Sequence, residues 1–332
     1  MAMTERDLLQ SLTLPVMVAP MFLVSGPELL LASCRAGVIG SLPTPNARDL
    51  TILTSWLDQI QEGIAAIKKE RGEGGERDER DENDQNVPLW LLNMIVHRTY
   101  DRFDAELELV KQYQPPLVTT ALGSPKRVVA DVHAYGGKVF ADVTNVMLAK
   151  KAIDAGVDGL ILVCHGAGGH TGLHNPFAFI AEVRKFWDGY IGLSGGIMNG
   201  RDLHACQVLG ADFSVMGTRF IGAKESLVVD DYRTMLVESD LTDVITSDKV
   251  SGVPANWLKK SLEKSGVSIE TLPGKAADFS GNIANDKKAW RDIWSAGEGV
   301  GQITTFQTVS EIVATLLAEY EASLGKKGRS PA

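Results

Sequence analysis

Three glycine-rich clusters, each following an apolar run between residues 159 and 220, constrain the fold more than any other feature of the chain. They are residues 166–172 (Gly-Ala-Gly-Gly-His-Thr-Gly), 194–197 (Ser-Gly-Gly-Ile) and 216–220 (Met-Gly-Thr-Arg-Phe). Because each cluster begins where an apolar run stops, we expect each in a loop at the carboxyl end of a strand. A (β/α)8 barrel keeps its chemistry in such loops, and those after its last two strands commonly bind a phosphate. The pattern predicts a phosphate-anchored cofactor enzyme.

Short apolar runs alternate with helical patterns along the chain. We expect strands at residues 16–20, 37–41, 89–93, 117–120, 138–143, 159–163, 190–193 and 213–216. Helical patterns between and after them include residues 47–69, 143–155, 201–209 and 306–324. This alternation indicates an α/β protein with a parallel sheet. Eight such units favour closure as a TIM barrel over an open doubly wound sheet.

Two stretches fall outside this repeat. Residues 71–86 are mostly charged and contain no apolar residue, which is typical of a flexible solvated loop, with an acidic docking tail as the alternative. Residues 224–290 are too long for a strand-to-helix connection and predict a small helical lid at the barrel mouth. The expected organisation is a barrel over 1–223, a lid or substrate subdomain over 224–293, and a return segment with the final barrel helix over 294–325.

Composition excludes several classes of partner. The 332 residues carry a formal net charge of −9, so no basic face favours nucleic acid or an anionic membrane. No apolar run has the length of a membrane span, and the first residues lack the order of a signal peptide. Three isolated cysteines and the absence of metal-ligand spacing argue against disulfides or a metal site. We expect a cytoplasmic protein, and a homodimer remains open.

Six short motifs together carry a family resemblance. They are residues 19–21 (Ala-Pro-Met), Asn93, residues 167–172, residues 194–197, residues 216–220 and residues 294–297 (Trp-Ser-Ala-Gly). In this order and spacing the chain resembles the FMN-dependent nitronate monooxygenases, formerly called 2-nitropropane dioxygenases. The FMN-dependent enoyl-acyl-carrier-protein reductases are relatives with the same fold. The resemblance covers the barrel nearly end to end.

The resemblance implies FMN as the cofactor and assigns roles to particular residues. His170 would face the flavin as the catalytic base, a task that suits histidine because its ordinary pKa lies near neutral pH. Residues implied to contact FMN are Ala19, Pro20, Met21, Asn93, Asp142, Gly169, Ser194, Gly195, Gly196, Met216, Gly217 and Thr218. Among these, the glycines of the last two clusters and Thr218 would hold the phosphate. Residues implied to contact the substrate are His165, Gly168, Trp294 and Ser295.

Two positions depart from the family pattern. Gly166 stands where many members carry glutamate, and the neighbouring His165 either compensates for it or is only a polar strand end. Asp142 stands where some relatives have lysine. Since a carboxylate would oppose the negative charge of a reduced flavin, we expect Asp142 to hydrogen-bond Thr144, Asn145 or a substrate group.

The predicted reaction is the oxidation of an alkyl nitronate by dioxygen to a carbonyl compound and nitrite, with His170 first deprotonating any neutral nitroalkane. An NAD(P)H-dependent enoyl-thioester or quinone reductase is the alternative enzyme, and a flavin-binding redox sensor is the alternative outside catalysis. No GxGxxG motif is present, so a nicotinamide would bind transiently as a substrate. The missing glutamate at Gly166 weighs against an acyl-carrier-protein substrate. So does the lack of basic residues around the barrel mouth, since these would attract an acidic carrier protein.

Overall fold

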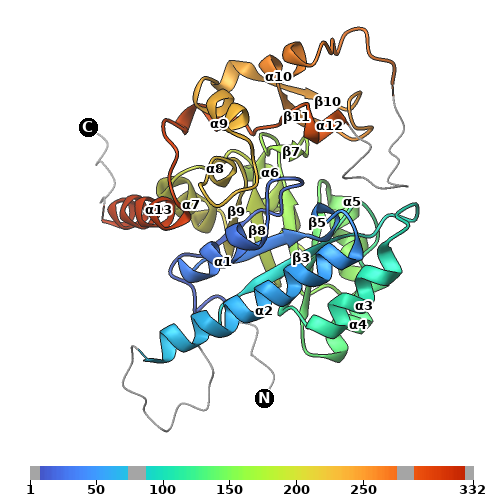
Figure 1. Cartoon of the computed structure of the whole chain (residues 1–332), viewed down its shortest axis with the longest axis vertical. Helices are drawn as coiled ribbons and strands as arrows, with labels where there is room; N and C mark the ends of the chain where they lie inside the picture. The colour runs from blue at the N-terminus through green and yellow to red at the C-terminus, as the bar shows by residue number, and fades with distance from the viewer. Residues whose placement is uncertain (1–7, 74–86, 275–287, 326–332) are drawn as a thin grey trace.

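The structure is a computed structural model that describes residues 8–73, 87–274 and 288–325. Eight parallel strands form its central sheet (Figure 1). They are β1 (Val16–Val18), β2 (Gly40–Pro43), β3 (Trp90–Ile95), β4 (Leu117–Ala121), β5 (Lys138–Val143), β6 (Gly159–Val163), β8 (Tyr190–Ser194) and β9 (Phe213–Met216).

The sheet closes on itself between its first two strands. The strand order is β1-β9-β8-β6-β5-β4-β3-β2, and a parallel bridge joins Met17 to Ile39 across the remaining gap. There the Val18 amide donates to the Ile39 carbonyl at 2.9 Å, and the Ile39 amide donates to the Val16 carbonyl at 2.9 Å. The predicted (β/α)8 barrel is confirmed.

The second strand begins three residues later than the sequence predicted. Gly37 has a φ of +80°, a backbone conformation that favours glycine, and its amide donates to the Cys34 carbonyl at 3.1 Å. The start of the predicted strand is therefore the turn that ends α1 (Pro27–Arg35). The next helix, α2 (Leu50–Glu73), also begins late, because the Asp49 carboxylate caps it by accepting from the Ile52 amide at 2.8 Å.

Aromatic side chains fill the barrel near the amino-terminal ends of its strands. The rings of Phe140 and Phe213 stack with centroids 5.7 Å apart, and Tyr190 lies 5.9 Å from Phe140. Glycines on neighbouring strands make room for these rings: a Cβ at Gly159 would lie 2.7 Å from Phe140, and one at Gly192 would lie 2.4 Å from Phe213. The interior is thus a packed core at this end, and a ligand has space only near the carboxyl ends of the strands.

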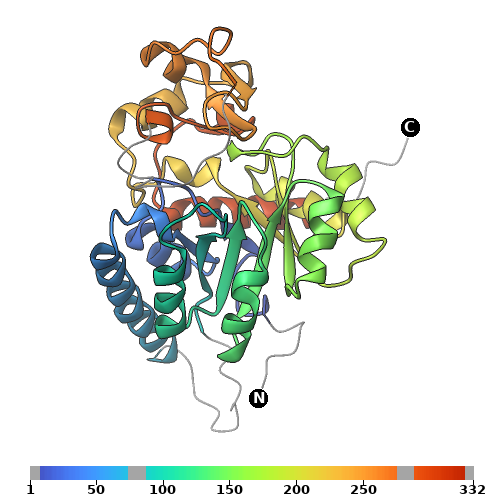
Figure 2. The same cartoon turned by 90° about the vertical axis from the view of Figure 1, so that its right-hand side faces the viewer.

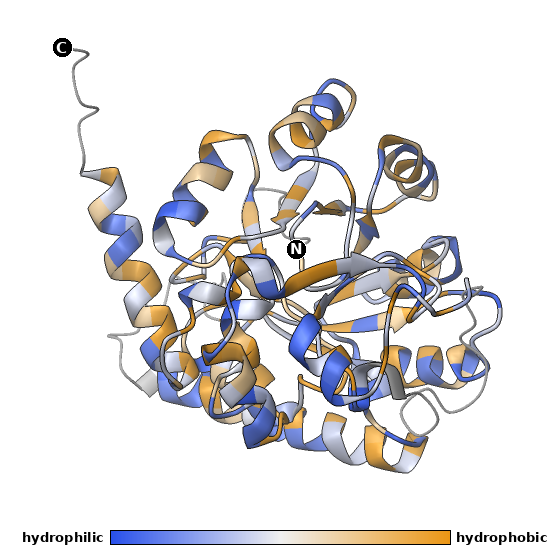
Figure 3. Cartoon of the chain, turned by 90° about the horizontal axis from the view of Figure 1, so that it is seen from above, coloured by the Kyte–Doolittle hydropathy of each residue, from blue (hydrophilic) through white to orange (hydrophobic). Residues whose placement is uncertain are grey.

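Helices surround the barrel and turn their apolar faces toward it (Figure 3). Besides α1 and α2 they are α3 (Phe103–Tyr113), α4 (Lys126–Ala134), α5 (Val146–Asp154), α6 (Pro176–Val183), α7 (Gly200–Val208), α8 (Thr218–Ile221) and α13 (Val309–Leu324). A short 3-10 turn, η1 (Thr44–Asn46), follows β2, and another, η3 (Val300–Gln302), precedes α13. Among the described helices, none is long and apolar enough to cross a membrane.

The segment after α8 forms a separate layer above the barrel (Figure 2, orange). It is built from α9 (Asp230–Val237), η2 (Leu241–Asp243), β10 (Val244–Ser247), β11 (Ala255–Leu258), α10 (Lys259–Lys264) and α12 (Lys288–Arg291). The predicted helical lid therefore also contains strands: β10 and β11 pair antiparallel, and β11 pairs with β7 (Gly169–His170) of the barrel. Of the charged stretch 71–86, residues 71–73 end α2 and residues 74–86 lie outside the described part.

Candidate active site

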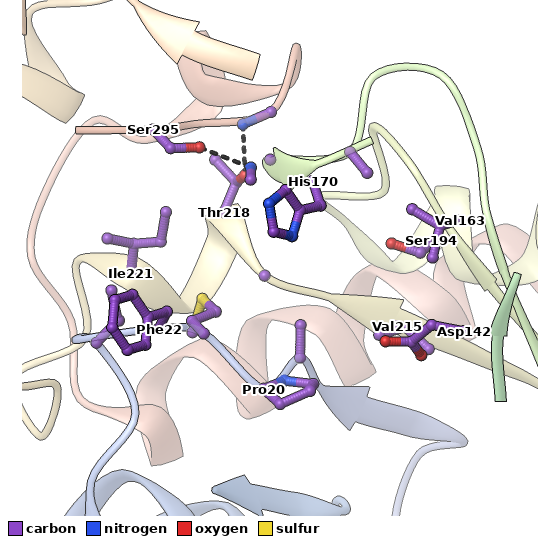
Figure 4. A pocket seen from close by; sticks show the side chains of 18 of the residues that line it. Pro20, Phe22, Asp142, Val163, His170, Ser194, Val215, Thr218, Ile221 and Ser295 are labelled. Atoms are coloured by element: carbon purple, nitrogen blue, oxygen red, sulfur yellow. Dashed lines mark hydrogen bonds between the residues drawn. The ribbon is translucent and has the colours of Figure 1, made fainter. Parts of the chain in front are cut away.

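A cavity of about 250 Å³ lies at the carboxyl ends of the barrel strands, under the lid. It gathers fourteen of the residues that the sequence predicted for the site: Ala19, Pro20, Met21, Asn93, Asp142, Gly168, Gly169, His170, Ser194, Gly195, Gly196, Gly217, Thr218 and Ser295. Figure 4 shows His170 on one side of this space and Pro20 on the other. No lysine or arginine lies among its lining residues, as far as the chain is described.

The loop after β1 is fixed by a buried asparagine that the sequence analysis did not single out. Asn46 donates to the carbonyls of Met21 at 3.0 Å and Ser25 at 2.7 Å, and its side-chain oxygen accepts from the Leu23 amide at 2.9 Å. Leu23 has a φ of +59°, unusual for a residue with a side chain. These bonds hold Met21 in a defined turn along the cavity wall.

The two glycine loops leave open space where a phosphate was predicted. Gly196 has a φ of +70°, and a Cβ added to it would meet no atom within 4 Å. Gly217 precedes α8, and its own added Cβ would lie 3.4 Å from Ala19. The Thr218 hydroxyl accepts from the Gly297 amide at 2.8 Å, which leaves the hydroxyl hydrogen for another acceptor (Figure 4). An anion with several oxygens suits this combination of accessible backbone and hydroxyl donor.

His170 is held by the barrel and the lid together. As part of β7 it pairs with Ala255 of β11, and its imidazole meets the ring of Trp290 edge-on, with centroids 5.2 Å apart. The preceding amide, of Gly169, donates to the Ser295 hydroxyl at 2.6 Å, and that hydroxyl donates to the Asn256 carbonyl at 2.6 Å. Both partners of the Ser295 hydroxyl are thus backbone groups, so it anchors the loop that carries the histidine.

Asn93 and Asp142 supply polar groups from the barrel wall. Asn93 donates to the Thr119 hydroxyl at 2.9 Å, which orients the amide and leaves its oxygen and its second N–H as the remaining groups. Asp142 makes no hydrogen bond to Thr144 or to Asn145, whose side chain instead caps α5 by accepting from a backbone amide. The two expected bonds to Thr144 and Asn145 are therefore absent, because strand alternation turns Asp142 toward the barrel interior. A bond from Asp142 to a substrate group stays a prediction. Burial raises the pKa of Asp142 to about 7.

Three residues predicted for the site lie outside the cavity lining. Met216 is fully buried in β9, and its carbonyl accepts from the Ala19 amide at 2.9 Å, so it positions the first loop. Trp294 is buried at the start of the return segment and stacks on Tyr232 of the lid, with ring centroids 4.9 Å apart. His165 is half exposed, with its Nδ1 3.3 Å from Oε1 of Glu298.

Glu298 also takes the space beside Gly166. A Cβ at Gly166 would lie 2.9 Å from Oε2 of Glu298, and the Glu298 amide donates to the Gly166 carbonyl at 3.0 Å. A carboxylate from the return segment therefore occupies the space that a side chain at position 166 would take. No sequence motif indicated this, because the two residues are brought together only by the fold.

The lid adds wall residues that the motifs did not indicate. Tyr232, Val250, Ser251 and Trp290 line the cavity from segments between barrel helix α8 and the return to the barrel. Tyr232 contacts the cavity while its hydroxyl donates to the Ser295 carbonyl. For Tyr232 and Trp290 the large aromatic side chain was the only available signal in the sequence, and Val250 and Ser251 offered none. In the part of the chain that is described, no cluster of acidic, histidine or cysteine side chains could hold a metal.

Solved structures with the same architecture support the fold. The nitroalkane oxidase from Streptomyces ansochromogenes superposes with a TM-score of 0.76 at 19% identity, covering 96% of this chain and 99% of that one. FabK from Thermotoga maritima superposes with a TM-score of 0.70 at 22% identity, covering 95% of each chain. At these identities the likeness is one of fold alone.

Two sequence relatives differ in their named reactions. The chain is 25% identical to a nitronate monooxygenase of Paraburkholderia phytofirmans, over 93% of each protein. It is 30% identical to the (3aS,4S,5R,7aS)-5-hydroxy-7a-methyl-1-oxo-octahydro-1H-indene-4-carboxyl-CoA dehydrogenase of Rhodococcus jostii, but over only 48% of this chain and 46% of the dehydrogenase. The match therefore spans about half the length of that dehydrogenase.

The family model described as nitronate monooxygenase matches residues 6–319, which include all eight barrel strands and the lid. The protein therefore belongs to the nitronate monooxygenase family and is a flavin-dependent oxidoreductase.

Proposed function

We propose that this protein binds FMN in the cavity and oxidises alkyl nitronates with dioxygen to a carbonyl compound and nitrite. The observation that carries the proposal is the position of His170 beside a cavity that also opens onto the glycine loops of β8 and β9. Membership of the nitronate monooxygenase family supports the same reaction. When bound, FMN would supply the electron-transfer chemistry, which no side chain can provide.

The described residues suit both the phosphate and the isoalloxazine ring of FMN. The backbone of Gly195, Gly196 and Gly217, with the Thr218 hydroxyl, would hold the phosphate. Pro20 and Met21, with Ala19, would lie against the isoalloxazine ring, and Ser194, Gly169 and Asn93 would contact its polar atoms. The mostly apolar remainder of the lining would exclude water from the ring.

His170 would act on the substrate. Its imidazole would remove the α-proton of a neutral nitroalkane and would orient a nitronate that is already ionised. The Ser295 hydroxyl and the edge-on Trp290 ring fix the loop and the ring plane before the substrate arrives. We propose the 224–293 segment as the substrate lid, since Trp290 and Tyr232 reach the cavity from it.

A single anaerobic experiment tests the proposal. The FMN-loaded protein is mixed separately with ethyl nitronate, NADH and NADPH, and the flavin absorbance is followed. Reduction by ethyl nitronate, with nitrite appearing once air is admitted, is the expected result. Reduction by a nicotinamide alone would contradict the nitronate reaction.

The partial relative from Rhodococcus jostii favours a second candidate, an NAD(P)H-dependent redox reaction on a thioester. A coenzyme A thioester carries several phosphates, whereas the cavity lining holds no lysine or arginine within the described residues. We therefore rank it below nitronate oxidation. NADPH oxidation that depends on an added enoyl thioester would reverse this order.

A further inference from the structure

Asp142 is an acidic side chain without a partner inside the cavity. Strand alternation turns it inward: Phe140, two residues earlier, belongs to the barrel interior, whereas Val139, Ala141 and Val143 pack outward against the helices. Among the described residues it has no hydrogen bond or ion pair. In Figure 4 its carboxyl group points toward the space between His170 and Pro20.

Within the described part of the chain, no charged group compensates the charge of Asp142. The flanking strands β4 and β6 contain no ionisable residue. The ionisable residues of the two packed helices lie across the sheet from it: Lys126, Arg127, Asp131 and His133 on α4, and Lys150, Lys151 and Asp154 on α5. Within the cavity lining, the other ionisable side chains are His170 and Tyr232.

The protonation state of Asp142 therefore follows from its burial. Removing a carboxylate from water without a cation nearby disfavours the ionised form, which is why the pKa rises to about 7. Below that pH the group is mainly a neutral acid with one O–H donor. The apolar side chains of Ile161, Val163 and Val215, which also line the cavity, offer this donor no acceptor.

We propose that Asp142 binds the flavin as a protonated acid, donating a hydrogen bond to an electron-rich oxygen or nitrogen of the isoalloxazine ring. This inference rests on the proposed cofactor. The lone pairs of a ring carbonyl would repel a carboxylate but accept from a carboxylic acid. Because the hydrogen bond exists only in the protonated form, binding raises the pKa of Asp142 further, and the apoprotein takes up a proton when FMN binds above pH 7.

The test compares FMN affinity across pH in the wild type, Asp142→Asn and Asp142→Leu. Affinity is measured from quenching of FMN fluorescence by the apoprotein between pH 6 and 9. We expect wild-type affinity to fall above pH 7 by up to about tenfold per pH unit, as the donor ionises. The Asn variant keeps a donor that does not titrate, so its affinity should stay near the wild-type value at pH 6. The Leu variant should bind weakly at every pH.

Two controls isolate Asp142 from other titrating groups. The FMN phosphate has a pKa of about 6, and its contribution cancels in the ratio of wild-type to Asn affinities. The same pH series in a His170→Asn background removes the imidazole and should leave the ratio unchanged. Calorimetry in two buffers of different ionisation enthalpy adds a direct readout: the wild type should take up a proton at pH 8, and the Asn variant should not.

Equal pH profiles for the wild type and the Asn variant, with no proton uptake, would overturn the inference. That result can coexist with nitronate oxidation, in which case the proposed function stands. Conversely, a pH-linked FMN site that fails to oxidise nitronates would leave the role of Asp142 intact and remove the proposed reaction. A protein that binds no FMN at any pH would overturn both.

Discussion

The hydroxyl of Ser295 accepts a hydrogen bond from the amide of Gly169 at 2.6 Å across 126 residues of sequence. It fastens the return segment from the lid to the loop that carries His170. The Ser295 amide and carbonyl are in turn both bonded to the Tyr232 hydroxyl. The position of the proposed base is thus set by a residue that follows the lid.

Replacing Ser295 by alanine should loosen this loop. The Gly169 amide and the Asn256 carbonyl would each lose a partner in a partly buried place, at a cost of about 1–3 kcal/mol. We expect a lower melting temperature and a lower kcat, with nitronate KM changed less. Ser310→Ala on the exposed face of α13 is the control and should behave as wild type. Full activity in Ser295→Ala would show that the loop is held by other contacts.

Replacing His170 by asparagine should separate neutral from ionised substrates. General-base catalysis typically contributes about 10²–10⁴-fold, so turnover of nitroethane should fall by that order. Turnover of ethyl nitronate, which needs no proton removed, should fall far less. His174→Asn, four residues along and exposed, is the matched control. Equal losses on both substrates would assign His170 to binding or orientation.

Replacing Gly196 by alanine should weaken FMN binding. The added methyl group would enter the open space between the glycine loops and would also strain a φ of +70°. Gly266 in the lid has a φ of +67° and the same open surroundings, so Gly266→Ala carries the strain without touching the cavity. We expect a lower FMN affinity in Gly196→Ala only, measured by titration of the apoprotein. Equal affinities in the two variants would place the phosphate elsewhere.

Replacing Asp142 by asparagine should stabilise the apoprotein in a pH-dependent way. The folded-state pKa of Asp142, about 7, lies above the unfolded value, so the wild type loses stability as pH rises between about 4 and 7. This loss approaches about 1.4 kcal/mol per pH unit and then stops. The advantage of the Asn variant should grow through that window and remain constant above it.

Urea unfolding of the apoprotein at pH 4, 5.5, 7 and 8.5 measures this difference. Glu311→Gln serves as the opposite control, because hydrogen bonds to Thr308 lower the pKa of Glu311. That variant should become less stable than wild type as pH rises. A difference between wild type and Asp142→Asn that does not change with pH would contradict the raised pKa.

The order of strands, the barrel class and the glycine loops could be predicted from the sequence, because they rest on local signals. Apolar runs that end in glycine mark the strand ends, and the parallel topology brings those ends to one face. Thirteen of the fourteen predicted residues that line the cavity lie on barrel strands or in the loops that follow them, and Ser295 comes from the return segment. The position of Gly37, by contrast, was misassigned to a strand, because an apolar run does not reveal where a preceding helix turn finishes.

Only the tertiary structure decided the contacts between segments that are distant in the sequence. The strand pairing of His170 with Ala255, the aromatic contact with Trp290 and the Ser295 anchor all join the barrel to the lid. The occupation of the space beside Gly166 by Glu298 is of the same kind. The fold also decides the isolation of Asp142, because the pKa of this residue depends on the groups that surround it in space and not on its neighbours in sequence.

The sequence determined which residues reach the mouth of the barrel, because strand direction and alternation are local. The fold decided their partners and charge states, because burial and hydrogen bonding depend on the whole chain.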